Sequence, residues 1–269
     1  MEGFEFFRPC EPLRPYVRFY WRFRSRRATS ALTFPTGCPM LIFHRGTPFR
    51  VPELERRQDR ATVSGQVDFA SHIASDGDAD TIAVVFRPWG AGRFLDLPLS
   101  SLRNLEVSGY DLEDRGLNLL SERVLACDDG TEAIAAAERW LLRRLATPPR
   151  AAYALDRVRA AVGELFVSPR TPIASLASHA CLSRKQFERH FGALVGIAPK
   201  TYAAIVRFHL SLGEMERCGG RVDYARIAYD CGYADQSHFI RDCRRFSGRT
   251  PAVLAATGPL RSDLLFDPF

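Results

Sequence analysis

Residues 232–251 read GYADQSHFIRDCRRFSGRTP, and residues 181–199 read CLSRKQFERHFGALVGIAP. Five pairs of related residues are each 52 positions apart, namely Ser183 and Asp235, Phe187 and Phe239, Arg189 and Arg241, Gly196 and Gly248, and Pro199 and Pro251. A constant separation over this many positions is typical of an internal repeat. The chain therefore contains the same structural unit twice.

Each copy is predicted to form a helix, a tight turn and a second helix. In the first copy, Thr171 is the expected N-cap, and Pro172 occupies the first helical position, where its missing amide hydrogen costs nothing. The second helix of that copy opens with Ser183 and Gln186, which have the spacing of a capping box. Asp235 takes the N-cap position in the second copy. We expect the units at about 171–191 and 223–246.

The second helix of each copy has an apolar inner face and a polar outer face. The inner faces carry Phe187 and Phe191 in the first copy, and Phe239, Cys243 and Phe246 in the second. The outer faces carry Arg184, Lys185, Glu188 and Arg189 in the first copy, and Gln236, Ser237, His238, Arg241 and Arg245 in the second. Arg and Lys can donate to guanine, Gln pairs with adenine, and Glu accepts from cytosine. A solvated helix shows similar charges, but their duplication favours reading of DNA.

A single long helix is predicted between the two copies, over residues 199–218. It begins at Pro199 and is expected to stop at Gly219 and Gly220. About 19 helical residues span roughly 28 Å, which is close to the ~34 Å between successive major-groove faces of B-DNA. One rigid helix could therefore hold two recognition helices about one turn of DNA apart.

Residues 153–260 resemble the DNA-binding domain of AraC-type (AraC/XylS) bacterial transcription regulators, whose signature is similar to GYADQSHFIRDCRRFSGRTP. Cys243 departs from it, because a Phe is usual there, and this predicts looser packing of the second recognition helix. The resemblance implies two helix-turn-helix units that bind double-stranded DNA. It implies base contacts by Lys185, Glu188, Arg189, Gln236, Ser237, His238 and Arg241. We expect backbone contacts from Arg184, Lys200, Thr201 and Arg245.

The first half of the chain is predicted to be β-rich. In residues 16–24, YVRFYWRFR, apolar and polar residues alternate with the period of a strand. Further strands are expected at 39–45, 49–54, 60–67 and 81–88. Helices are expected at 112–126 and 131–145, the latter capped by Thr131. This pattern predicts a barrel-like or sandwich domain, and FPTGCPMLIF and FRPWGAGRFL resemble the sensing domains of a bacterial subgroup of such regulators.

The whole chain is therefore predicted to be an α+β protein of two domains, at 1–148 and 153–260, with a linker near Pro148 and Pro149. The excess positive charge lies in the second part, because residues 1–150 have a net charge of +1 and residues 151–269 have +5. We expect a cytoplasmic, nucleoid-associated protein, since no apolar run approaches the ~18 residues of a membrane span. RNA polymerase is a candidate partner. The stripe Ile134, Leu141, Leu142 and Leu145 either supports a homodimer or covers the barrel.

No catalytic motif, cofactor site or metal site is predicted, and the sequence names no small-molecule effector. Two alternatives stay open at this point. Cys10 and Cys38 could oxidise as a pair in a thiol-based redox sensor. A DNA-repair enzyme fused to the same DNA-binding domain would need a zinc-holding cysteine cluster near its N-terminus, where the sequence offers only these two cysteines.

Overall fold

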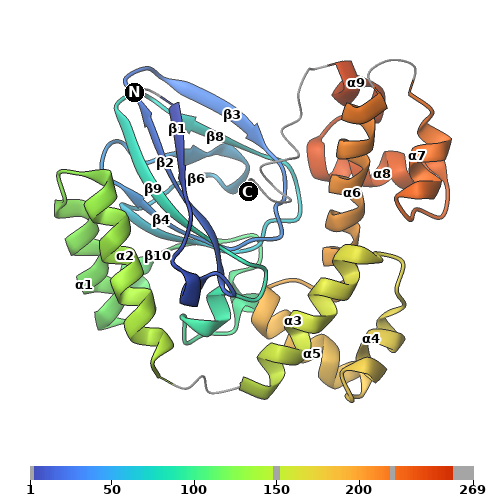
Figure 1. Cartoon of the computed structure of the whole chain (residues 1–269). Coiled ribbons are helices and arrows are strands. Elements are labelled where there is room, and N and C mark those ends of the chain that lie inside the picture. Colours follow the sequence, from blue (N-terminus) through green and yellow to red (C-terminus); the bar gives the residue numbers. More distant parts are fainter. Residues whose placement is uncertain (1–2, 148–151, 219–221, 257–269) are drawn as a thin grey trace.

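The computed structural model of the chain describes residues 3–147, 152–218 and 222–256. Both the proposed linker at Pro148 and Pro149 and the proposed helix stop at Gly219 and Gly220 lie outside these residues. Within them, a β-rich part precedes an all-helical part (Figure 1). The predicted α+β class, with strands first and helices last, is confirmed.

Two antiparallel sheets form the β-rich part. The larger has the strand order β1 (Gly3–Phe7), β2 (Val17–Ser25), β9 (Ala79–Phe86), β4 (Met40–His44), β7 (Ala61–Ser64) and β10 (Glu106–Ser108). The smaller has the order β3 (Thr29–Thr33), β8 (Ser71–Ser75), β5 (Arg50–Val51) and β6 (Arg56–Arg57). The strands thus remain in two sheets and do not close into one barrel. Short 3-10 helices connect them: η1 (Glu11–Leu13), η2 (Pro52–Leu54), η3 (Ala91–Arg93), η4 (Leu99–Leu102) and η5 (Gly109–Leu112).

The long strand β2 has two different faces. Its register against β9 shifts between Val17 and Phe19, so that Tyr20 faces the helices while Phe19 faces the other side. On that other side, Phe19, Trp21 and Phe23 line up with the phenylalanines of β1, for example Phe4 at 4.7 Å between ring centres from Phe23. These aromatic side chains of β2 therefore lie on the sheet face turned away from α1 and α2.

Two helices, α1 (Arg115–Ala126) and α2 (Gly130–Leu145), cover the face of the larger sheet to which Tyr20 points. Ile134 and Leu141 of α2 are buried in the core that this face shares with Leu41 and Val84. The apolar stripe of α2 therefore covers the sheet and is not a free surface for a second copy. The N-cap of α2 is Asp129, which accepts from the Glu132 amide, so the prediction of Thr131 as the cap was wrong.

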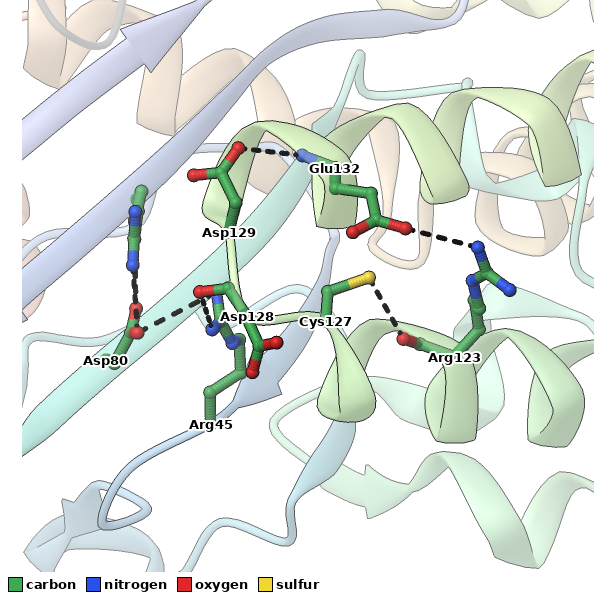
Figure 2. Close-up of polar contacts among 8 residues, drawn as sticks. Arg45, Asp80, Arg123, Cys127, Asp128, Asp129 and Glu132 are labelled. Atoms are coloured by element: carbon green, nitrogen blue, oxygen red, sulfur yellow. Dashed lines mark hydrogen bonds and ion pairs between the residues drawn. The ribbon is translucent and has the colours of Figure 1, made fainter.

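Charged contacts fix the turn between α1 and α2 to the sheet, as Figure 2 shows. Asp80 of β9 accepts two hydrogen bonds from Arg22, at 3.0 Å each, and lies 3.7 Å from Arg45. Arg45 in turn donates to the backbone carbonyl of Asp128 at 2.8 Å. The helices are thus tied to the sheet at their connecting turn as well as through their apolar faces.

The all-helical part contains α3 (Ala152–Val167), α4 (Ile173–His179), α5 (Arg184–Val195), α6 (Pro199–Cys218), α7 (Tyr224–Asp230), α8 (Gln236–Ser247) and α9 (Pro251–Ala256). Their buried residues form one continuous cluster that extends from Leu155 to Leu254 and includes Trp89 of the β-rich part. Figure 1 shows α6 running between the pair α4 and α5 and the pair α7 and α8. No helix of the described residues is long and apolar enough to cross a membrane.

Candidate nucleic-acid interface

The two helix pairs have the same turn. The amide of Leu182 donates to the Ala177 carbonyl, and the amide of Tyr233 donates to the Ala228 carbonyl, both at 2.9 Å. The residue before each of these amides has a positive φ, which is 49° at Cys181 and 93° at Gly232. The second copy then has one additional residue, Ala234, before its next helix. The repeat in the sequence therefore corresponds to a repeated local structure.

Local hydrogen bonds begin the second helices as the sequence predicts. Ser183 and Gln186 form the reciprocal capping box of α5, and Asp235 accepts from the His238 amide at 2.7 Å at the start of α8. The paired glycines Gly196 and Gly248 end these helices in the left-handed region, with φ of 93° and 69°. For α4, the cap is Pro172 with no side-chain bond, so the predicted cap at Thr171 was wrong.

The inner faces of both helices are fully buried. Phe187 and Phe191 of α5 and Phe239 and Phe246 of α8 have no exposed surface. Cys243 is also completely buried, and α8 continues regularly through it. The smaller side chain is therefore accommodated without interrupting the helix.

The outer face of α5 is exposed. Arg184, Lys185, Glu188 and Arg189 all reach solvent. Glu188 pairs with Arg184 at 2.9 Å along the helix. Lys185 and Arg189 have no ion pair or hydrogen-bond partner among the described residues. Two cations of α5 are thus free to meet an external acceptor.

The outer face of α8 is also exposed but includes one side chain that turns inward. Gln236, Ser237 and Arg241 lie at the surface, and Arg241 has no ion pair in the part of the chain that the structure describes. His238 is only 33% exposed, lies 3.6 Å from the Asp242 carboxylate and packs edge-on against Tyr233. Burial raises the pKa of Asp242, which the nearby charges of His238 and Arg207 oppose.

The residues expected to contact the DNA backbone have different surroundings. Lys200 is exposed and Thr201 is half-buried in the first turn of α6. Arg245 of α8 instead donates to Asp68 of the β-rich part at 3.0 Å. Sequence reasoning missed Asp68, because it lies 177 positions from its partner and belongs to no motif.

The β-rich part also contacts the long helix α6. The Nε2 of His209 donates to the Pro35 carbonyl at 2.6 Å, and the ring of Phe208 lies edge-on to Phe34 at 5.6 Å between ring centres. A cavity of about 300 Å³ lies beside these contacts, lined by residues of both parts that include Arg18, Trp89, Tyr202 and Ile205. Burial lowers the pKa of His209 to about 4, so this side chain is neutral at pH 7.

Comparisons with known families agree with this geometry. Residues 176–256 match the model of a helix-turn-helix domain family, and residues 5–108 match a domain family of unknown function, DUF6597. Residues 176–256 are a helix-turn-helix domain. The matched helix-turn-helix family agrees with the helix-turn-helix units that the sequence predicts for this part of the chain. No sequence among the curated proteins matches the chain.

Several solved structures are similar to the chain at low identity. ToxT from Vibrio cholerae O395 has 12% identity and a TM-score of 0.43, over 95% of this chain and 99% of that one. ToxT of Vibrio cholerae strain SCE256 with an unsaturated fatty acid bound has 9% identity and a TM-score of 0.41, over 94% of this chain and 95% of that one. The AraC-like transcriptional activator CuxR has 13% identity and a TM-score of 0.30, over 69% of this chain and 73% of that one.

Proposed function

We propose that the chain is a sequence-specific regulator in which α5 and α8 enter successive major grooves of one duplex. The observation that carries this proposal is the repeated exposure of an unpaired arginine, Arg189 on α5 and Arg241 on α8, at the same place in two equivalent units. A guanidinium can donate to guanine O6 and N7 together. Lys185, Glu188, Gln236 and Ser237 are the neighbouring side chains that we expect to reach base edges.

The length of α6 supports reading of two half-sites by one molecule. Its 20 residues span about 30 Å, and both units share one hydrophobic cluster with it. A rigid connection of this length suits half-sites that are one turn of DNA apart. We propose in addition that the β-rich part modulates binding, since it contacts α6 through Pro35 and α8 through Asp68.

The redox alternative lacks physical support. Burial raises the pKa of the Cys10 thiol, and the neighbouring Glu138 raises it further, which disfavours the reactive thiolate. Cys10 packs against the core beneath α2, whereas Cys38 packs with Phe19 and Val85 on the other face of the sheet. For the repair-enzyme alternative, the described residues contain no group of three or more His, Cys, Asp or Glu side chains that could hold a metal ion.

Selection of bound duplexes from a random DNA pool tests the proposed function. Two blocks of base preference, with centres about 10 base pairs apart, are expected with the full chain. Enrichment of no sequence, or of a single short block, would show that the proposal is wrong.

A further inference from the structure

One buried carboxylate of the β-rich part binds a recognition helix. Asp68 follows β7, and its side chain is only 8% exposed. Its Oδ2 accepts hydrogen bonds from Arg103 at 2.6 Å and from Arg245 of α8 at 3.0 Å, while Oδ1 accepts one from Asn104 at 3.1 Å. Arg103 and Asn104 belong to the same part as Asp68, so Arg245 is the partner that comes from the other side of the contact.

The segment that carries Asp68 also contacts the other recognition helix. A Cβ atom added to Gly196, at the end of α5, would lie 3.0 Å from the Gln66 side chain and 3.2 Å from the Leu99 carbonyl. Gln66 is almost completely buried in this contact. Residues 66–68 therefore reach both second helices near their C-terminal ends, and Asp68 is the charged member of this contact.

The chemistry of the Asp68–Arg245 pair resembles that of an arginine with a phosphate. A carboxylate and a phosphate use the same guanidinium donors, and Asp68 both occupies the Nη2 amine of Arg245 and offsets the positive charge that a phosphate would meet. Arg245 is 44% exposed, so an external anion can reach it. Burial raises the pKa of Asp68, but the bonds from Arg103 and Asn104 and the charge of Arg245 outweigh this and leave the pKa below its ordinary value. The carboxylate is therefore charged at neutral pH.

We propose that Asp68 competes with a DNA phosphate for Arg245 and thereby lowers the affinity of the full chain for DNA. The inference rests on the proposed function, because it requires that α8 bind DNA with Arg245 near the backbone. A change in the β-rich part that withdraws Asp68 would release one cation of α8 for DNA. Asp68 thus sets how much of the charge of α8 is available.

The substitution Asp68→Asn in the full chain tests the proposal. It removes the charge that holds Arg245, so affinity for a selected operator is expected to rise about threefold to tenfold at 0.1 M salt, and the slope of log K against log salt is expected to become steeper by about one unit. Asp76→Asn is the matched control: it removes the same charge from an aspartate that pairs with Arg50 and Arg57, and affinity should not change. Thermal melts verify that each variant is folded.

The Asp68→Asn change is also tested in the Arg245→Ala variant. In that variant, Asp68→Asn should leave the affinity for DNA unchanged, because the guanidinium for which Asp68 and the phosphate compete is absent. An equal gain from Asp68→Asn with and without Arg245 would overturn the proposal, and so would unchanged or weaker binding of Asp68→Asn alone. A wild-type chain that binds no DNA would instead refute the proposed function.

A second variant keeps the test available if Asp68→Asn does not fold. Arg103→Ala leaves the Asp68 carboxylate with Arg245 as its remaining guanidinium partner among those that the structure shows. The proposal then predicts weaker binding of DNA. Tighter binding by Arg103→Ala would contradict it.

Discussion

Arg189 and Arg241 occupy the same position in the two units and extend from exposed faces of α5 and α8. Neither is paired with Glu188 or Asp242, the acidic neighbours that could have held them within the fold: Glu188 pairs with Arg184, and the ion pairs of Asp242 are with His238 and Arg207. Their side chains are therefore available for DNA.

Replacement of either arginine by Ala should relax base preference in one half-site and leave the other unchanged. The expected loss of affinity is about 1–3 kcal/mol for each bidentate contact. Binding-site selection with both variants, together with thermal melts, measures this. Arg139→Ala, an exposed arginine on α2, is the control for loss of one charge. A lower melting temperature with equally weakened binding of every sequence would instead assign the two arginines a structural role.

Lys200 lies at the surface in the first turn of α6, beside the end of α5. It is expected to contact a phosphate and no base. The change Lys200→Ala should weaken binding of all sequences to a similar extent and reduce the salt slope by about one unit. Titrations of a selected operator and of random DNA at several salt concentrations check this. A changed base preference would show that Lys200 reads sequence.

The long helix α6 contacts both the helix pairs and the β-rich part, as α5 and α8 also do. It contacts the two helix pairs on one side and the segment around Pro35 on another. The His209 ring in this contact is neutral at pH 7, because burial lowers its pKa to about 4 and outweighs the hydrogen bond to Pro35, which favours the charged form. The packing of α6 against the β-rich part is therefore expected to be sensitive to acid.

The free energy of unfolding should decrease as the pH falls from about 6.5 towards about 4. The unfolded chain binds a proton on His209 near pH 6.5, its ordinary pKa, while the folded chain binds it only near pH 4. The folded state therefore loses up to about 1.4 kcal/mol per pH unit for this residue across that window, and the loss ends below it. Burial has the same effect on His44.

Urea melts of the wild type and of His209→Gln across this pH range measure the contribution of His209 to the free energy of unfolding. Gln cannot take up the proton, so the variant should show a shallower dependence on pH. The same slope in both proteins would mean that His209 is not the residue responsible.

Elements that depend on neighbouring residues, such as capped helices, could be predicted from the sequence. Elements that depend on contacts between distant segments could not. The capping residues Ser183, Gln186 and Asp235 act within one helical turn, so their spacing was sufficient. The strand predicted at 49–54 was too long: only Arg50–Val51 forms β5, and Pro52, which cannot donate a backbone hydrogen bond, begins η2. Strands β3 and β8 were missed, because their short, mostly polar sequences acquire strand structure through pairing with each other.

The candidate site could be predicted as far as it depends on the repeat. The exposed faces of α5 and α8 follow from helical periodicity, and Lys185, Arg189 and Arg241 lie on them. The inward turn of His238 towards Asp242 depends on the packing of Tyr233, which spacing alone does not show. Asp68 could not be found from the sequence, because only the folded chain brings it to Arg245.

For the whole molecule, the proposed function requires a fixed distance between the two recognition helices. One hydrophobic cluster joins α4, α5, α6, α7 and α8, with Trp89 of the β-rich part included. Such a closely packed core does not stretch to fit a different spacing. The chain should therefore tolerate changes of sequence between the half-sites but not changes of their separation.

Binding to a selected operator with five base pairs inserted between the two half-sites tests this most directly. The insertion rotates one half-site by about half a turn of DNA, so that α6 can no longer present both helices to their grooves. We predict that affinity falls to that of an operator with a single half-site, and that Arg189→Ala and Arg241→Ala no longer affect separate blocks of one footprint. Unchanged affinity for the lengthened operator would contradict the account of two recognition helices held rigidly one turn apart.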